Sequence, residues 1–356
     1  MVWPLVARDA ELARIGAAFS GGRGVVLTGE AGTGRSRLLD EAVDLAVGLA
    51  EGHVVHSLDG WPATGRIVLV LDDAELLEPE VADRVRRAAA LDRVTAVIAV
   101  RTGAWVPEGI SRLWLDGLAE RVEVRPFDLD EIRAVLLARL GAVVDDATTE
   151  GMGLLTAGNA LLLRELTEHA AAEGSLRRAD GVWRWSGLAC ADGRLADVVR
   201  MRLGRLAPDE AELIDMVSLA GTLCVDRFPA LAKAAESLNR RGVLVAEGAY
   251  VRMTYPLCGE VVAAGMPELT ARRLRALLAP TTRKPVRRVV LPCVGASPGL
   301  TSREREVAQH AAGGLTNRDI ADLLVVSVRT VENHLQRVYG KLGITTRAAL
   351  AAVLSA

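Results

Sequence analysis

The residues best suited to chemistry lie near the start of the chain, in the segment Gly29–Ser36 (GEAGTGRS). Its glycines allow the backbone to wrap around a phosphate with N–H groups, and a helix that starts there favours the anion. The spacing fits the Walker A pattern, except that arginine replaces lysine. Ser36 is positioned to ligate Mg²⁺. The candidate nucleotide-binding residues are Gly29, Gly32, Thr33, Gly34, Arg35 and Ser36.

A second candidate motif is RIVLVLDDAELL, in which five apolar residues precede Asp72 and Asp73. As a Walker B motif, it would use Asp72 to hold Mg²⁺ and Asp73 to polarise the attacking water. The alternative is an acidic helix cap after a strand. Arg101 ends a later apolar run, where it could reach a γ-phosphate or be a surface arginine.

The third group of chemically informative residues lies near the C-terminal end of the sequence, on the polar face of a helix that begins after Ser327. Asn333 and Gln336 could pair with adenine edges, and Glu332 could accept from cytosine N4. Phosphates would be contacted mainly by basic side chains, with polar neighbours as helpers. This phosphate-contacting set is Arg329, Thr330, His334, Arg337, Lys341 and Arg347. The alternative interpretation is a generic small helical bundle.

The elements that must position the first two motifs alternate between strand and helix. Apolar runs predict strands at 24–28, 53–58, 67–71, 94–100 and 112–118. Leucine, valine and alanine spacing predicts helices at 36–49 and 78–90. This alternation, with nearly continuous apolar strands, predicts a parallel sheet buried on both faces.

The rest of the chain is predicted to be mostly helical from 128 to about 279, with a hairpin at 243–253. Four basic residues and three prolines make 281–298 a linker. Capping boxes begin two helices, at Thr301 with Glu304 and at Thr316 with Asp319, and Gly313-Gly314 ends the first. A third helix buries the stripe Val328, Val331, Leu335, Val338 and Leu342. A fourth helix follows 345–347, which completes helix-turn-helix geometry.

Bulk composition limits the classes of protein. A length of 356 residues with 50% hydrophobic residues predicts two or three domains with large cores. No apolar run is long enough for a membrane span, and the start of the sequence does not resemble a signal peptide. The four dispersed cysteines are typical of reduced thiols in a cytoplasmic protein. A net charge of −2 means that any DNA affinity must be local.

Only three of the 43 basic residues are lysines. This preference for arginine, together with the high alanine content, indicates a high-GC genome, and we expect an actinobacterial source.

Both ends of the chain resemble one family. The segment LTSREREV...GLTNRDIADLLVVSVRTVENHLQRVYGKLGITTRAAL is similar to the LuxR-type helix-turn-helix over 300–350. The N-terminal half resembles the large ATP-binding, MalT-like LuxR regulators, whose NTPase is of the signal-transduction (STAND), AAA+-like class. LVARDAELARI resembles the segment that opens this module near the adenine, which makes Val6 and Arg8 candidate nucleotide contacts. Segments 113–132 and 157–166 resemble its strand-to-lid and lid motifs.

The resemblance implies an α/β P-loop NTPase with a parallel sheet, a helical lid and a winged-helix-like region, followed by an all-α DNA-binding domain. The expected divisions are 1–125 for the core, 126–195 for the lid, 196–280 for the winged-helix-like region, 281–298 for the linker and 299–356 for the helix-turn-helix.

The sequence departs from this pattern at three residues. Arg35, Ala160 and Tyr255 stand where the family has lysine, proline and histidine. The segment between the two Walker motifs is also short, and a linker occupies the place of the helical-repeat sensor domain. Arginine is a bulkier, planar fork than lysine, so nucleotide binding is expected to persist on backbone contacts while fast hydrolysis is lost.

These observations predict a cytoplasmic transcription regulator that binds ATP or ADP with Mg²⁺, hydrolyses it little or not at all, and thereby modulates DNA binding or assembly. The expected partners are double-stranded DNA at an inverted repeat, a second copy of the chain that pairs through the fourth helix (Ala349, Leu350 and Val353), and RNA polymerase. Two alternatives remain open. One is an inactive NTPase fold that senses a small molecule or a protein. The other is an active P-loop ATPase that its DNA-binding domain localises.

Overall fold

The computed structural model describes residues 3–49, 53–55, 67–188, 192–278, 302–312 and 315–324, together with Val328, Val331, Leu335 and Val338. By its internal contacts the chain divides into two compact units, Met1–Val290 and Leu291–Ala356. The division falls within the segment 281–298 that the sequence predicts to be a linker.

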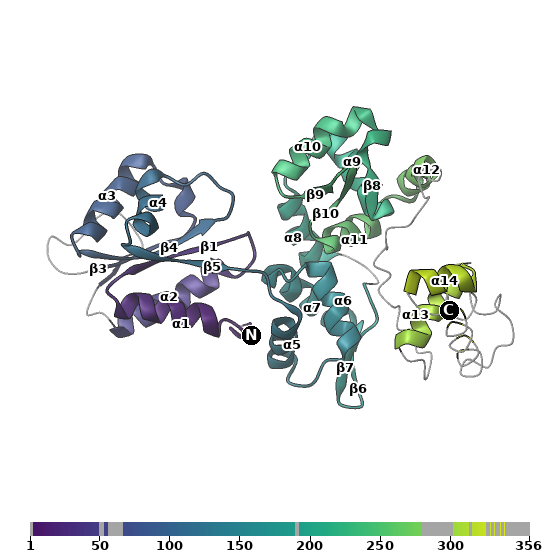
Figure 1. Cartoon of the computed structure of the whole chain (residues 1–356), viewed down its shortest axis with the longest axis horizontal. Coiled ribbons are helices and arrows are strands. Elements are labelled where there is room, and N and C mark those ends of the chain that lie inside the picture. The colour runs from purple at the N-terminus through teal and green to yellow at the C-terminus, as the bar shows by residue number, and fades with distance from the viewer. Residues whose placement is uncertain are drawn as a thin grey trace. The chain divides into compact units, whose positions relative to one another are not determined.

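A five-stranded parallel sheet opens the first unit, in the order β2-β3-β4-β1-β5 (Figure 1). The strands are β1 (Gly24–Gly29), β2 (His53–Val55), β3 (Ile67–Leu71), β4 (Val94–Arg101) and β5 (Ala119–Val124). Every residue of β1 and β3 is buried, which explains their largely apolar sequences. The parallel, P-loop type of α/β fold predicted from the sequence is thus confirmed.

Helices cover both faces of this sheet (Figure 1). They are α1 (Asp9–Ser20), α2 (Arg35–Leu49), α3 (Pro79–Ala90) and α4 (Glu108–Leu115), with the short 3-10 helix η1 (Ala74–Leu76) after β3. Side chains alternate along each strand: Val25 and Leu27 pack with the core under α1 and α2, and Val26 packs with the core under α3 and α4. The two cores fix the sheet edge where β1 and β3 end.

The predicted strand at 112–118 is wrong, because residues 108–115 form α4 and the strand follows at 119–124. Ile110 and Leu113, three residues apart, are fully buried against the sheet, as the helical period requires. Gly109 lets α4 approach α3 closely, since a Cβ there would lie 2.3 Å from the Ala82 carbonyl carbon. This packing against a neighbouring helix prevails over the strand-like local sequence.

The segment that follows the sheet contains α5 (Leu129–Leu140), α6 (Asp146–Thr156) and α7 (Ala160–Glu173). It also contains an antiparallel hairpin, β6 (Leu176–Ala179) with β7 (Val182–Trp185), which our prediction of a mostly helical region missed. Asp180 and Gly181 both have positive φ angles, 52° and 81°, as a two-residue type I′ turn requires. The Asp-Gly dipeptide, a preferred two-residue hairpin turn, was the available signal.

The last part of the first unit combines helices with a three-stranded antiparallel sheet, in the order β8-β10-β9. Its elements are α8 (Gly193–Leu203), α9 (Pro208–Ala220), β8 (Thr222–Cys224), η2 (Val225–Arg227), η3 (Pro229–Leu231), α10 (Ala232–Arg240), β9 (Leu244–Glu247), β10 (Tyr250–Met253), α11 (Pro256–Ala264) and α12 (Glu268–Leu278). Strands β9 and β10 confirm the hairpin predicted at 243–253.

The second unit contains α13 (Ser302–Ala312) and α14 (Asn317–Leu324), as predicted. The capping box of α14 is present: the Asp319 N–H donates to Thr316 Oγ1 at 3.2 Å, and the Thr316 N–H donates to Asp319 Oδ2 at 3.0 Å. Of the predicted stripe, Val331, Leu335 and Val338 are buried in one apolar cluster with Val307 and Ile320. Val328 corrects the prediction, because its side chain is 40% exposed. Thr301, Gly313-Gly314, Leu342 and the fourth helix lie outside the described residues.

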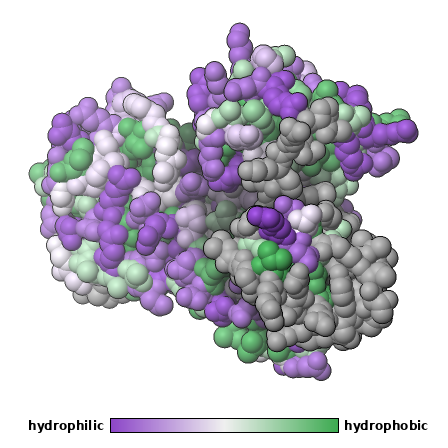
Figure 2. Space-filling view, turned by 45° about the vertical axis from the view of Figure 1, so that its right-hand side comes forward, coloured by the Kyte–Doolittle hydropathy of each residue, from purple (hydrophilic) through white to green (hydrophobic). Residues whose placement is uncertain are grey.

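The visible surface in Figure 2 is largely hydrophilic over the described residues, with hydrophobic side chains scattered among polar ones. Large exposed hydrophobic residues include Leu76 and Trp105, which follow β3 and β4. Within the described residues, every helix is too short or too polar to traverse a lipid bilayer.

Candidate nucleotide site

The glycine-rich segment forms a loop between the end of β1 at Gly29 and the start of α2 at Arg35. Gly32 and Gly34 have φ angles of +80° and +97°, which L side chains rarely adopt. A Cβ on Gly34 would meet no atom within 4 Å, whereas a Cβ on Gly32 would lie 2.6 Å from Asn159 Oδ1. The space at Gly34 therefore lies open directly before the N-terminus of α2, where an anion is favoured.

The two candidate Mg²⁺ ligands lie together at the ends of neighbouring elements. Ser36 Oγ, in the first turn of α2, donates a hydrogen bond to Asp72 Oδ2 at 2.6 Å. The other carboxylate oxygen of Asp72 accepts from the Asp73 N–H at 2.9 Å, which fixes its orientation. One hydroxyl and one carboxylate, with water and phosphate oxygens as further ligands, are a donor set that suits Mg²⁺.

Arg35 and Asp73 form an ion pair, with Arg35 Nη2 3.6 Å from Asp73 Oδ1. The Arg35 side chain is 8% exposed, and that of Asp73 is 47% exposed. Arg35 Nη1 is buried and has no hydrogen-bond partner. A buried guanidinium with an unsatisfied edge, beside a glycine loop and the start of a helix, fits a phosphate group. The residues present thus fit a bound nucleotide with Mg²⁺.

Arg101 lies beside the loop, because Gly29 and Arg101 are register partners in the β1–β4 pair. The Thr102 N–H donates to the Gly29 carbonyl at 2.9 Å, which ties the two strand ends together. The Arg101 guanidinium is held by Glu75, with Nε 3.7 Å from Oε1. Arg101 is therefore next to the loop, but its guanidinium is paired with the Glu75 carboxylate.

Arg8 is buried, at 4% exposed, and hydrogen-bonds to the backbone of the glycine-rich loop. Its Nη2 donates to the Thr33 carbonyl at 3.0 Å and to the Arg125 carbonyl at 2.9 Å. Its guanidinium also stacks on the Phe127 ring, 4.2 Å from the centroid. These contacts make Arg8 a support of the loop backbone, while Val6, two residues earlier, is half-buried.

Three side chains from the later helical region also reach the loop, and none of them is among the site residues predicted from the sequence. Asn159 Nδ2 and Arg202 Nη1 both donate to the Ala31 carbonyl, at 2.9 and 3.1 Å. The Tyr255 hydroxyl donates to the Glu30 carboxylate, and Arg202 lies 3.8 Å from the Tyr255 ring centroid. Burial, followed by the hydrogen bond to Glu30, raises the pKa of Tyr255 to about 12.

The signals for these residues differ in strength. Asn159 precedes α7 and caps it, with the Leu162 N–H donating to Oδ1 at 3.2 Å, which is a pattern that sequence can reveal. Tyr255 was noted only as a departure from the family's histidine. Nothing in the sequence around Arg202 distinguishes it from other surface arginines.

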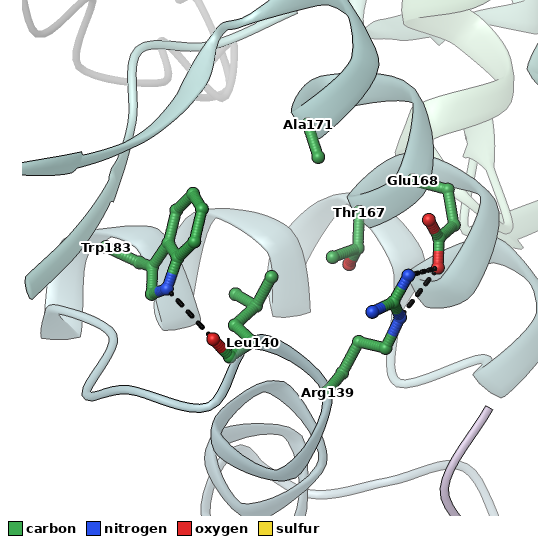
Figure 3. A pocket seen from close by; sticks show the side chains of 6 residues that line it. All are labelled: Arg139, Leu140, Thr167, Glu168, Ala171 and Trp183. Atoms are coloured by element: carbon green, nitrogen blue, oxygen red, sulfur yellow. Dashed lines mark hydrogen bonds and ion pairs between the residues drawn. The ribbon is translucent and has the colours of Figure 1, made fainter. Parts of the chain in front are cut away.

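A separate pocket of about 210 Å³ lies between α5, α7 and β7 (Figure 3). It is lined by Arg139, Leu140, Thr167, Glu168, Ala171 and Trp183. Its polar groups already bind one another: Arg139 Nη2 lies 2.6 Å from Glu168 Oε1, and the Trp183 indole N–H donates to the Leu140 carbonyl at 3.3 Å. Because these groups are paired with one another, the pocket has few polar groups left to bind a polar ligand.

The proposed DNA-reading residues all lie outside the described part of the chain: Arg329, Thr330, Glu332, Asn333, His334, Gln336, Arg337, Lys341 and Arg347. In this unit the structure describes α13 and α14, together with Val331, Leu335 and Val338, which are buried in one apolar cluster with them. Helices of this length around a small apolar cluster are the scaffold of a helix-turn-helix.

Comparison with known proteins agrees with this scaffold. Residues 298–354 match the family of bacterial regulatory proteins called the luxR family. A protein named as an HTH-type transcriptional regulator of Mycobacterium bovis is 51% identical over 51 residues, which cover 14% of this chain and 6% of that relative. The transcriptional regulatory protein NarL of Mycobacterium tuberculosis is 46% identical over 56 residues, covering 16% of this chain and 26% of NarL. The C-terminal region is therefore a LuxR-type DNA-binding domain.

This chain thus spans only a small part of the curated relatives that it matches. Among solved structures, Cdc6p from Pyrobaculum aerophilum aligns with 78% of this chain and 96% of its own, with a TM-score of 0.41 and 15% identity. A Walker-type ATPase of Pyrococcus abyssi aligns with 73% of this chain and 96% of its own, with a TM-score of 0.42 and 11% identity.

Proposed function

We propose that this protein is a cytoplasmic, DNA-binding transcriptional regulator whose N-terminal domain binds ATP or ADP with Mg²⁺ and hydrolyses it little or not at all. Nucleotide binding would modulate DNA binding or assembly through the LuxR-type domain. The observation that carries the nucleotide assignment is the Ser36–Asp72 hydrogen bond, 2.6 Å long, at the end of a glycine loop open at Gly34. This bond joins the first turn of α2 to the end of β3, which is where the Walker A and Walker B patterns place the two Mg²⁺ ligands.

In this proposal the backbone of 29–34 and the first turn of α2 hold the phosphates. Ser36 and Asp72 hold Mg²⁺, which when bound neutralises phosphate charge. Arg101 lies close enough to the loop to approach a γ-phosphate after release from Glu75. Val6 and Arg8 border the site on the side of the N-terminal segment, with Arg8 acting through the Thr33 carbonyl.

Slow hydrolysis is supported by the environment of the two residues that would accelerate it. Arg35 replaces the compact ammonium that tracks a transferring phosphoryl group. Asp73, which would polarise water, lies in a turn with its side chain 47% exposed. A carboxylate that faces solvent is not held against an attacking water, and is therefore poorly placed to act as a general base.

The DNA-binding half of the proposal rests on the match to the LuxR family over 298–354. Asn333 and Gln336 would read base edges, while Arg337 and Lys341 would contact phosphates. One such module has little contact area, so we infer a dimer on an inverted repeat, with RNA polymerase as the further partner.

Calorimetry with Mg–ATP and Mg–ADP tests the nucleotide assignment, with Asp72→Ala as the variant that should lose Mg²⁺-dependent affinity. Steady-state turnover should stay near background in the presence and absence of DNA. Turnover at ordinary ATPase rates would instead favour an active enzyme that the DNA-binding domain localises. Promoter-binding assays with and without nucleotide then measure whether the two ends of the chain are coupled.

A second candidate is a regulator whose NTPase fold has lost nucleotide binding and senses a small molecule or a protein. It is favoured by the side chains that cover the loop, since Tyr255, Arg202 and Asn159 all bind residues 30–31. Absence of heat with either nucleotide, for the natural protein and for Arg35→Lys alike, would support this candidate over the first.

A further inference from the structure

The two side chains of the Arg35–Asp73 ion pair differ in how exposed they are to solvent. Arg35 begins α2 and is anchored, with its side chain 8% exposed and its Cγ 3.2 Å from where a Cβ of Gly29 would lie. Asp73 follows β3 in an exposed turn, with its side chain 47% exposed. If the pair opens, Asp73 is the partner that can move into water.

The guanidinium of Arg35 is only half satisfied. Nη2 faces Asp73, while Nη1 is buried and lacks a partner. A buried charge with an unmade hydrogen bond is costly, and a planar guanidinium is best satisfied by two oxygens of one anion. A phosphate at the N-terminus of α2 would supply both oxygens, which a single carboxylate 3.6 Å away does not.

The backbone at Asp73 holds the carboxylate in this competing position. Asp73 has φ 49° and ψ 44°, a left-handed conformation that non-glycine residues rarely adopt. The hydrogen bond from its N–H to Asp72 Oδ1, 2.9 Å long, fixes this turn. Asp73 thereby lies beside the residue that holds Mg²⁺ and also next to the buried arginine.

We propose that Asp73 is an internal competitor of nucleotide phosphate for Arg35, and so sets the nucleotide affinity of this site. In the ligand-free protein Asp73 neutralises Arg35. When a nucleotide binds, its phosphate oxygens take over the guanidinium and Asp73 turns into solvent. This inference rests on the proposed nucleotide binding, and it assigns to Asp73 an effect opposite to that of a residue that helps to bind ligand.

The test measures the Kd of Mg–ADP by calorimetry, because ADP binding is not affected by hydrolysis. Asp73→Asn removes the charge, keeps the side-chain shape and tolerates the left-handed backbone. We expect it to lower the Kd about tenfold. Thermal unfolding of the ligand-free protein should show no gain in stability, since an ion pair has been lost. A residue with only a structural role would not raise affinity while leaving stability unchanged or lower.

The matched control is Asp92→Asn. Asp92 also has a positive φ, of 56°, but it precedes β4, at the opposite edge of the parallel sheet from Asp73. The Kd of the Asp92→Asn variant for Mg–ADP should stay within about twofold of the Kd of the natural protein. In an Arg35→Ala background, Asp73→Asn should lower the Kd far less than about tenfold, because the competed group is absent.

The outcomes separate the two hypotheses. If the natural protein binds Mg–ADP but Asp73→Asn leaves the Kd unchanged or raises it, the competition is overturned and the nucleotide assignment stands. The same holds if Asp73→Asn tightens binding equally without Arg35, since the effect would then be general electrostatic repulsion. If neither the natural protein nor any variant binds nucleotide, both proposals fail.

Discussion

The DNA-binding region and the candidate nucleotide site differ in how their residues are distributed along the sequence. The DNA-binding region is continuous in sequence, and residues 298–354 alone match the luxR family. The candidate nucleotide site is assembled from segments far apart, since Arg8, Ser36, Asp72, Asn159 and Tyr255 all contact the loop or its immediate neighbours. A local module tolerates transfer between proteins, whereas a distributed site depends on the whole first unit being folded.

The largest effect should come from breaking the apolar cluster that supports the local module. Leu335→Ala removes a buried side chain and leaves a cavity, which should destabilise the second unit by about 2–5 kcal/mol and weaken DNA binding. Nucleotide affinity should not change. Val328→Ala is the control, because Val328 is 40% exposed and should cost less than about 1 kcal/mol. Loss of nucleotide binding in Leu335→Ala would show that the two ends are not separable.

A substitution in the glycine loop should instead weaken nucleotide binding and leave DNA binding unchanged. Gly32→Ala combines an unfavourable φ of +80° with a Cβ 2.6 Å from Asn159 Oδ1, for a total cost of about 2–4 kcal/mol. Gly181→Ala has nearly the same φ, +81°, in open space and should cost only the backbone strain, about 1–2 kcal/mol. Denaturation midpoints and nucleotide affinity measure the difference. Equal costs at the two positions would argue against close packing of Asn159 on the loop.

The readout of DNA should divide by residue type. We expect a fragment of 295–356 to bind DNA by itself, and Asn333→Ala or Gln336→Ala to cost about 1–3 kcal/mol on the preferred site and alter base preference. Arg337→Ala or Lys341→Ala should weaken binding to all sequences and flatten its salt dependence. Binding titrations on matched and mismatched sites would check this. Unchanged affinity and preference in Asn333→Ala would mean that another face reads DNA.

The smallest expected effect concerns pH and the cap of α14. The hydrogen bond from the Thr316 hydroxyl lowers the pKa of Asp319 from its usual 3.8. Because the folded pKa is depressed, the stabilisation is fully present above the unfolded pKa and is lost as pH falls through the folded value. The stability difference between the natural protein and Asp319→Asn should therefore be constant near neutral pH and shrink below about pH 4. Scanning calorimetry across this range measures it, and a difference that grows on acidification would contradict it.

The predictions from sequence succeeded where local rules decide structure. Apolar runs located β1, β3 and β4, and the Thr316–Asp319 box located the start of α14. Where two local patterns competed, tertiary packing decided: residues 112–115 read as a strand but pack as a helix against α3. The β6–β7 hairpin was missed although its Asp-Gly turn was visible.

The sequence by itself determined the glycine loop, the order of the two acidic residues after β3 and the LuxR-type region, because each depends on neighbours in the chain. Only the tertiary structure decided that Asp73 pairs with Arg35, that Arg101 turns to Glu75, and that Tyr255 binds Glu30. These contacts join residues brought together by sheet order and helix packing, and burial then determines which charged groups must find a partner. No local pattern carries that information.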